Sequence, residues 1–133
     1  MTKTLVSHVG IAVKDLEAAI KSYAVLTGSQ NPAIENVDSE KVKVALFSSG
    51  GSRIELLAAT SEDSPIAKFI NNRGEGLHHI CIYVDDIKAK LSELKKAGFK
   101  VIDETYRSGA EGKKIAFVHP QSLNGVLIEL EER

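Results

Sequence analysis

The sequence predicts an α+β fold built by tandem duplication, in which each half has a strand, one helix and further strands. Residues 8–28 and residues 79–98 share the pattern of a short apolar strand followed by an amphipathic helix. His8 precedes His79 by 71 residues, and the two segments stay in register over most of their length. A chain of 133 residues with 43% apolar side chains is long enough to bury a core and is expected to form one domain.

The ends of the two halves are also alike. RIELL around Glu55 and LIELE around Glu129 are offset by 74 residues, as a small insertion in the second half would give. We therefore expect the first module at about residues 5–60, a linker helix at about 64–72 and the second module at about 76–131, within one domain.

Capping residues and helical spacing predict the two repeated helices. Asp15 suits the N-cap and Gly28 the C-cap of the first helix, and Asp86 and Gly98 take the same places in the second. The residues at helical spacing that should face the core are Leu16, Ala19, Ile20 and Tyr23 in the first helix and Ile87, Leu91 and Leu94 in the second.

A linker helix and further strands complete the prediction. The linker helix should begin where Ser64 precedes Pro65, because serine caps well and proline is tolerated in the first turn. Short apolar or alternating runs predict the remaining strands near residues 42–48, 53–58, 100–105, 114–119 and 125–131.

Four residues lie on strand faces opposite the aliphatic side chains: His8, Glu55, His79 and Glu129. If those faces curve inward, the two imidazoles and two carboxylates converge on a cavity. Such a nitrogen and oxygen donor set suits one divalent ion such as Co, Zn, Ni or Mn. Any one of the four alone is more often a structural histidine or a solvated carboxylate. The same residue types recur in the same order in both halves, and this repetition favours a metal site.

The strand KVKVALF carries a further candidate. Alternation places Lys43 opposite Val42, Val44 and Leu46, on the face predicted for the cavity. Carboxylate recognition, proton transfer and a solvated edge charge all remain open as roles for Lys43.

Composition limits the kind of ligand and the compartment. A net charge of −1 without long blocks of like charge argues against a protein that binds nucleic acid or coats a membrane, so the ligand should be a small molecule. The N-terminus lacks the apolar core of a secretory signal, and no apolar run has the length of a membrane span. The single cysteine, Cys81, fits a reducing compartment, and a cytoplasmic location is the expectation.

The patterns H-x-G-I-A-V, I-E-L-L, G-x-G-L-H-H-I-C, I-A-F-x-H-P and G-V-L-I-E-L, spread over residues 8–130, resemble the vicinal oxygen chelate (glyoxalase/bleomycin resistance) superfamily, and within it the methylmalonyl-CoA epimerases most closely. The resemblance implies tandem βαβββ modules that form a concave mixed sheet around one metal ion. It also implies that the ligands are His8, Glu55, His79 and Glu129, and that the protein is a homodimer.

The implied activity is epimerisation of 2-methylmalonyl-CoA, an acyl-CoA substrate, through an enolate. Glu55 and Glu129 would flank the enolate and exchange the proton on its two faces. Some epimerases keep a glutamate base at the position of Lys43, so this lysine is a third catalytic candidate. The basic residues near a glycine-rich turn that would meet the coenzyme A phosphates are Arg107, Lys113 and Lys114.

Two other functions remain open at this point. A glyoxalase I-type lactoylglutathione lyase would use the same four ligands and would also stabilise an enolate, formed from a glutathione hemithioacetal. A non-catalytic binding member of the superfamily is the third possibility, although such members generally lack the full ligand set that the sequence retains.

Overall fold

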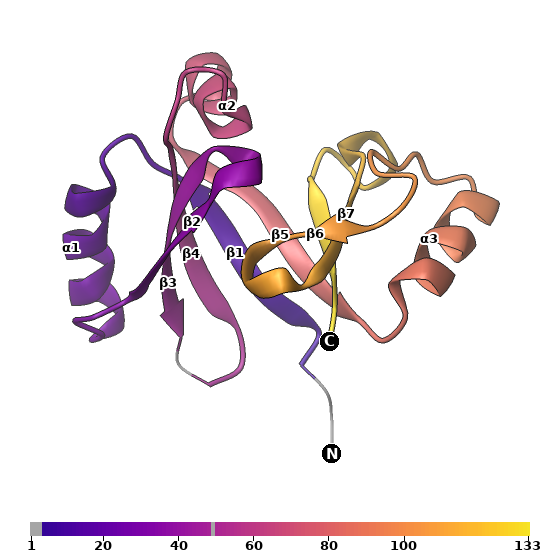
Figure 1. Cartoon of the computed structure of the whole chain (residues 1–133), viewed down its shortest axis with the longest axis horizontal. Helices are drawn as coiled ribbons and strands as arrows, with labels where there is room; N and C mark the ends of the chain where they lie inside the picture. Colours follow the sequence, from indigo (N-terminus) through magenta and orange to yellow (C-terminus); the bar gives the residue numbers. More distant parts are fainter. Residues whose placement is uncertain (1–3, 49) are drawn as a thin grey trace. The chain divides into compact units, whose positions relative to one another are not determined.

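The structure, a computed structural model, describes residues 4–48 and 50–133. Its strands and helices follow the order βαβββ, one helix, and βαβββ again, which confirms the α+β class (Figure 1). The elements are β1 (Val6–Ala12), α1 (Leu16–Thr27), β2 (Ala33–Val37), η1 (Asp38–Glu40), β3 (Val42–Ser48), β4 (Arg53–Ala59), α2 (Pro65–Arg73), β5 (Gly76–Val84), α3 (Ile87–Lys96), β6 (Arg107–Ser108), η2 (Ala110–Gly112), β7 (Lys114–Val118), η3 (Pro120–Ser122) and β8 (Ile128–Glu132).

The described chain divides into two compact units. Val9–His78 form the first, here called the N-terminal unit. Residues 4–8 together with His79–Arg133 form the second, the C-terminal unit. His8 is therefore grouped with the second half of the chain, although it lies near the start of the sequence.

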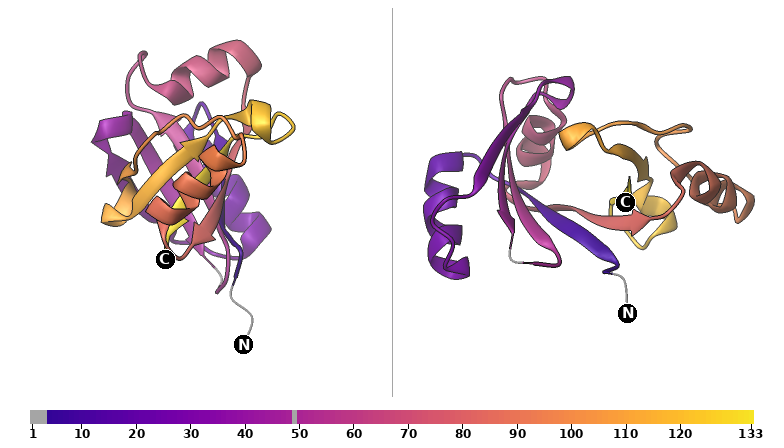
Figure 2. Two further views of the ribbon diagram at one scale, coloured as in Figure 1. Left: turned by 90° about the vertical axis from the view of Figure 1, so that its right-hand side faces the viewer. Right: turned by 60° about the horizontal axis from the view of Figure 1, so that its bottom comes forward.

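Both faces of the sheet in the N-terminal unit are covered by helices. The strands are ordered β2-β3-β4-β1, with antiparallel pairs β2–β3 and β3–β4. One face packs under α1 through Ala45, Phe47 and Leu56, and the other contacts α2 through Val44 and Leu57. Figure 2 shows the two helices on either side of β3 and β4.

The N-caps and the end of α1 form as the sequence predicts, whereas α3 is capped by Ala97, and Gly98 follows it with a left-handed φ of 89°. The carboxylates of Asp15 and Asp86 each accept the backbone N–H three residues further on, and the Ser64 hydroxyl accepts that of the residue after Pro65. Gly28 closes α1 with a left-handed φ of 75°. A left-handed φ costs glycine little because it has no β-carbon.

In the C-terminal unit, only one face of the sheet packs under α3. The strands are ordered β5-β8-β7-β6, and β5 and β8 are parallel. The α3 residues Ile87 and Leu91 pack with Val84 of β5, Ala116 of β7 and Leu130 of β8. Val84 and Leu130 thus lie on the helix-covered face, opposite to His79 and Glu129, as the alternation along these strands predicts.

The strand predicted at residues 100–105 is wrong in its position. In this stretch Val101 makes an isolated bridge to Val118, and the regular strand β6 comes later, at Arg107–Ser108. The N–H groups of Ile102 and Asp103 both donate to the carbonyl of Phe117, and the Asp103 carboxylate accepts the Phe117 N–H at 2.8 Å. A side chain thus replaces a backbone acceptor, which interrupts the ladder.

The sequence analysis did not predict strand β2. Its residues, Ala33–Val37, are exposed or half-buried and pair with β3 as the edge of the sheet. An edge strand that buries little apolar surface gives a weak periodic signal in the sequence.

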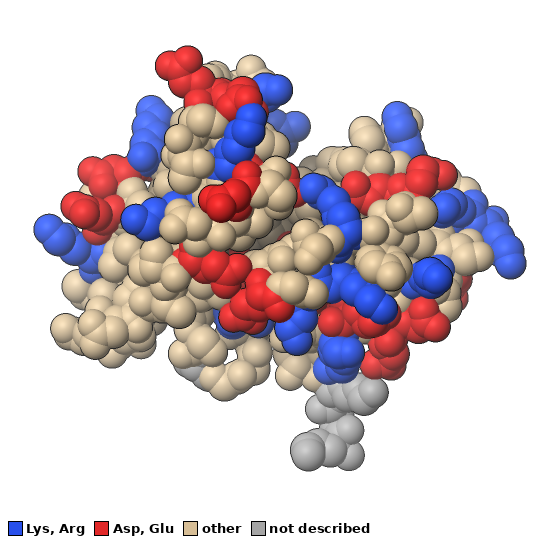
Figure 3. All heavy atoms as spheres, in the orientation of Figure 1, with Lys and Arg blue, Asp and Glu red and all other residues tan. Residues whose placement is uncertain are grey.

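The surface carries charges of both signs. On the face drawn in Figure 3, lysine and arginine side chains are interspersed with aspartate and glutamate, in keeping with the net charge of −1. Among the described residues, no helix combines the length and the apolar character needed to cross a membrane.

Candidate metal centre

Three of the four predicted ligands meet inside the C-terminal unit. They come from three strands: His8 from β1, His79 from β5 and Glu129 from β8. All three side chains are buried. Pairing of β5 with β8 places Cys81 opposite Glu129, so His79, two residues before Cys81, lies on the same face as the glutamate.

The spacing of the three donor atoms fits a metal ion. The Nε2 atoms of the two histidines are 3.2 Å apart, and they lie 3.2 Å (His8) and 3.0 Å (His79) from Glu129 Oε1. Two donors at about 2.1 Å from one ion are about 3.0 Å apart at right angles and about 3.4 Å apart in a tetrahedron. The triangle therefore has the size of one face of a coordination polyhedron, and its imidazole and carboxylate donors suit a divalent transition metal.

The histidines keep Glu129 anionic. Burial raises the pKa of the Glu129 carboxyl, but hydrogen bonds from His79 and His8, together with their charges, outweigh burial and lower the pKa to about 2. A carboxylate that is ionised at any physiological pH is ready to bind a cation without first losing a proton.

A second buried group of polar side chains lies behind His8. Ser7 Oγ is 3.0 Å from His8 Nδ1 and donates to Glu131 Oε1 at 3.2 Å, and Cys81 Sγ lies 3.9 Å from the same oxygen. Ser7 and Glu131 were not among the residues predicted for the site. Alternation along β8 gave a usable signal, because it puts Glu131 on the same face as Glu129.

Glu55, the fourth predicted ligand, belongs to the N-terminal unit. Its side chain is buried on β4, and its Oε2 atom accepts hydrogen bonds from Arg53 Nη2 at 2.9 Å and Nε at 3.2 Å. Arg53 thus balances the charge of this carboxylate. The assignment of Glu55 to the metal centre stays a prediction.

The face predicted for Lys43 is wrong. Leu46 pairs with Glu55 across β3 and β4, whereas Lys43 pairs with Ala58, so Lys43 and Glu55 point to opposite faces. The exposed Lys43 shares its face with Ala45, on the side of α1. Because β3 is apolar on both faces, its residue types alone do not show which face turns toward a site.

The basic residues predicted to meet coenzyme A are exposed in the C-terminal unit. Arg107 lies 3.4 Å from Asp103 and stacks over Phe117, with 5.4 Å between its guanidinium carbon and the ring centroid. Lys114 lies over the ring of Tyr106. Lys113 is exposed as well, and the role of all three residues stays a prediction.

The other two histidines make structural contacts. His78 packs edge-on against Phe69, with 4.9 Å between ring centroids. His119 accepts the N–H of Gln121 through Nδ1 and so caps the short helix η3. Both histidines thus contribute to packing or helix capping.

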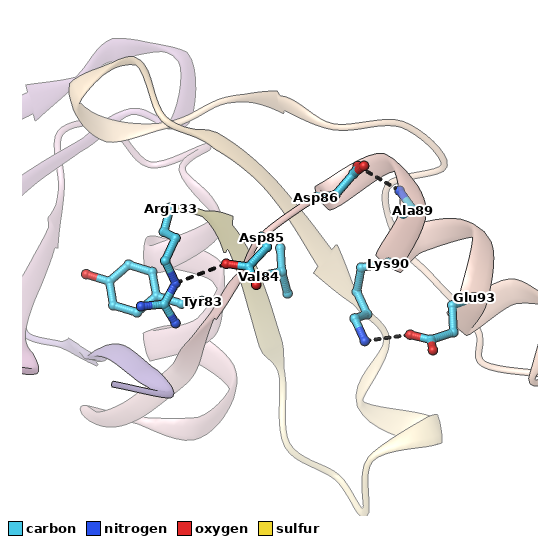
Figure 4. A pocket seen from close by; sticks show the side chains of 8 residues that line it. All are labelled: Tyr83, Val84, Asp85, Asp86, Ala89, Lys90, Glu93 and Arg133. Atoms are coloured by element: carbon cyan, nitrogen blue, oxygen red, sulfur yellow. Dashed lines mark hydrogen bonds and ion pairs between the residues drawn. The ribbon is translucent and has the colours of Figure 1, made fainter. Parts of the chain in front are cut away.

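A surface pocket of about 430 Å³ lies between the end of β5, α3 and the last residue (Figure 4). Arg133 stacks on Tyr83 and pairs with Asp85, and Lys90 pairs with Glu93. Asp86, which also lines the pocket, accepts the N–H of Ala89. None of the three clustered metal-ligand candidates lines this pocket.

Comparison with known proteins identifies the family of this chain. The sequence profile of the glyoxalase/bleomycin resistance protein/dioxygenase superfamily matches residues 7–117. This chain belongs to that superfamily. The superfamily predicted from the sequence is thereby confirmed, and its α+β fold agrees with the observed order of strands and helices.

Several relatives of this chain are methylmalonyl-CoA epimerases. The mitochondrial methylmalonyl-CoA epimerase of Homo sapiens is 41% identical over 127 residues, which cover 95% of this chain and 72% of that protein. The ethylmalonyl-CoA/methylmalonyl-CoA epimerase of Cereibacter sphaeroides is 41% identical over 128 residues, which cover 95% of this chain and 96% of that protein. The crystal structure of methylmalonyl-CoA epimerase from Mycobacterium tuberculosis matches with a TM-score of 0.89 at 37% identity, covering 99% of this chain and 91% of that one.

Proposed function

We propose that this protein catalyses the metal-dependent epimerisation of 2-methylmalonyl-CoA. The observation that carries the proposal is the buried triangle of His8, His79 and Glu129, in a chain whose relatives include methylmalonyl-CoA epimerases. A solved epimerase in complex with methylmalonyl-CoA is 34% identical, covers 98% of this chain and has a TM-score of 0.88, which adds support for an acyl-CoA substrate.

The reaction requires removal of one acidic proton and its return on the other face. The proton lies on the carbon between the thioester and the carboxylate, and its loss leaves an enolate. A bound divalent ion would supply Lewis-acid stabilisation for the negative charge that develops on oxygen. His8, His79 and Glu129 would hold this ion, and we include Glu55 as the fourth ligand. Co, Zn, Ni and Mn all suit the donor set.

We assign the proton transfers to Glu55 and Glu129. Inversion needs one group on each face of the planar enolate, and these carboxylates are the corresponding residues of the two modules. Lys43, the third candidate from the sequence, is exposed on the sheet face opposite to the one that carries Glu55. This placement argues against a catalytic role for Lys43.

Arg107, Lys113 and Lys114 are proposed to contact the coenzyme A phosphates. Their exposure leaves them accessible to a large anionic ligand, and arginine and lysine are the usual partners of phosphate. We further propose a homodimer in the cytoplasm, which light scattering on the purified protein and fractionation of cells would test.

Proton NMR in deuterated water tests the activity directly. The protein is stripped of metal, reloaded with one ion at a time and mixed with methylmalonyl-CoA. We expect loss of the signal of the proton between the two carbonyl groups only with metal-loaded protein, and strongly slowed loss in His79→Ala. A parallel sample contains methylglyoxal and glutathione. Turnover of that mixture alone would show that the protein is a glutathione-dependent lyase and would overturn the proposed epimerase activity.

A further inference from the structure

The group behind His8 forms a chain of hydrogen bonds that leads away from the metal centre. It joins His8 Nδ1 to Ser7 Oγ at 3.0 Å, and Ser7 Oγ to Glu131 Oε1 at 3.2 Å. Ser7 is fully buried, and Glu131 is 5% exposed. A carboxylate in such a place needs partners, since burial without them is costly.

The chemistry of the three groups sets the direction of each bond. Ser7 donates its single hydroxyl hydrogen to Glu131 Oε1. The serine oxygen can then only accept from His8, and the hydrogen of that bond must be carried by Nδ1. In a metal-bound protein, the ion would take the place of the hydrogen that joins Nε2 to Glu129. A neutral imidazole that keeps its hydrogen on Nδ1 then presents its lone pair from Nε2, the atom next to His79 and Glu129.

We propose that Ser7 and Glu131 are positioning residues that hold His8 as the Nδ1–H tautomer and aim its Nε2 lone pair into the metal centre. The inference rests on the proposed metal centre and adds two residues to it. A metal-binding histidine generally donates the N–H of its other ring nitrogen to a carboxylate, a carbonyl or water. This hydrogen bond fixes the ring orientation and makes the metal-binding nitrogen more basic. Here a serine hydroxyl lies between the imidazole and the carboxylate.

The same atoms also fit a different arrangement. His8, Cys81 and Glu131 offer donor atoms within 4.8 Å of one another, which is close enough for a second metal ion. Both ring nitrogens of His8 would then have to be without hydrogen, and the ring would bridge two ions. The Ser7 hydroxyl at 3.0 Å from Nδ1 favours the hydrogen bond, and the metal stoichiometry separates the two arrangements.

Zinc binding to the whole protein, measured by calorimetry against a competing chelator, tests the proposal. We expect one zinc per chain, about 10- to 100-fold weaker binding in Ser7→Ala, and about 10-fold weaker binding in Glu131→Gln, which keeps an acceptor oxygen. Ser7→Thr keeps the hydroxyl and should bind nearly as the wild type does, provided that its thermal unfolding is unchanged. The matched control is Glu132→Gln, on the same strand, because the Glu132 carboxylate accepts the N–H of Ile87 instead. Its zinc affinity should equal that of the wild type.

Nitrogen-15 NMR of the zinc-loaded protein supplies a readout that a merely structural role would not change. The His8 signals should show hydrogen on Nδ1 and metal on Nε2. Zinc affinity unchanged in both Ser7→Ala and Glu131→Gln, metal on Nδ1, or two zinc ions per chain would each overturn the proposal. A wild-type protein that binds no zinc would overturn the metal centre and this inference together. Zinc binding with the expected variant effects, but without deuterium exchange into methylmalonyl-CoA, would overturn the epimerase activity alone.

Discussion

At the scale of single residues, the charge of Glu129 links metal binding to acid stability. The pKa of this carboxyl falls from an ordinary 4.5 to about 2, because hydrogen bonds and charges from His79 and His8 outweigh the effect of burial. A group with a lowered pKa stabilises the folded state fully above its unfolded pKa, and this contribution is lost as the pH falls toward the folded pKa.

Glu129→Gln should therefore destabilise the metal-free protein near neutral pH and much less in acid. We expect a loss on the order of 2 kcal/mol at about pH 7, which shrinks between pH 4.5 and pH 2 as the wild-type carboxylate takes up its proton. Urea unfolding of both proteins across this range measures it. A stability difference that stays constant down to pH 2 would contradict the lowered pKa.

The two proposed proton-transfer residues are expected to act on opposite faces of the substrate. Glu55→Gln should slow deuterium exchange from one epimer, and Glu129→Gln from the other, by about 100-fold or more in the affected direction. Each variant starts from a single epimer, and the metal content is measured alongside so that ligand loss is not mistaken for loss of the base. Equal, full activity of both variants from both epimers would end the assignment.

The duplication in the sequence pointed to the candidate ligands that the structure groups together. His8, His79 and Glu129 were found because the same residue types recur at matching places, and the structure brings the three together. Ser7 and Glu131 were missed, because their contact spans 124 residues and depends on the order in which β1, β5 and β8 lie side by side. That order follows from backbone pairing, and periodicity within one strand does not report it.

At the scale of elements, strand burial explains why the face of Lys43 was assigned wrongly. Alternation identifies the inner face only where one side of a strand meets water, and β3 is covered over most of its length on both sides. The helices were easier to predict, because Asp15 and Asp86 cap them through contacts local in sequence.

Lys43→Met provides a direct check of the corrected face. Since Lys43 is exposed on the side of β3 opposite to that of Glu55, the variant should exchange deuterium into methylmalonyl-CoA within about twofold of the wild-type rate. Measurement of kcat and KM separately would show whether binding or proton transfer is affected. A fall in kcat of about 100-fold or more would return Lys43 to the catalytic candidates.

The irregular segment before β6 depends on one side chain. Asp103 accepts the Phe117 N–H and also lies beside Arg107, so Asp103→Ala leaves a partly buried donor without this acceptor. We expect a loss of about 1–2 kcal/mol in urea unfolding. Asp85→Ala is the matched control, because it removes an exposed carboxylate that pairs with Arg133, and it should cost less than about 0.5 kcal/mol. Equal losses in the two variants would contradict a structural role for the Asp103 hydrogen bond.

At the scale of the whole molecule, the proposed metal centre joins residues from the two ends of the chain. His8 and Glu129 are 121 residues apart, yet both belong to the C-terminal unit and their donor atoms lie 3.2 Å apart. An ion held by both residues and by His79 would bind the folded chain and not the unfolded one. Binding of this kind shifts the folding equilibrium by mass action.

Zinc should consequently raise the melting temperature of the protein. At a free concentration 100 times the dissociation constant, the gain is about 2.7 kcal/mol, which corresponds to a rise on the order of 10 °C for a chain of this length. His8→Ala removes the ligand that comes from the start of the chain, and it should abolish most of the rise, whereas Glu132→Gln should retain it. Calcium provides a second control, because it prefers all-oxygen sites and should leave the melting temperature nearly unchanged. A full zinc-dependent rise in His8→Ala would show that the ion binds elsewhere.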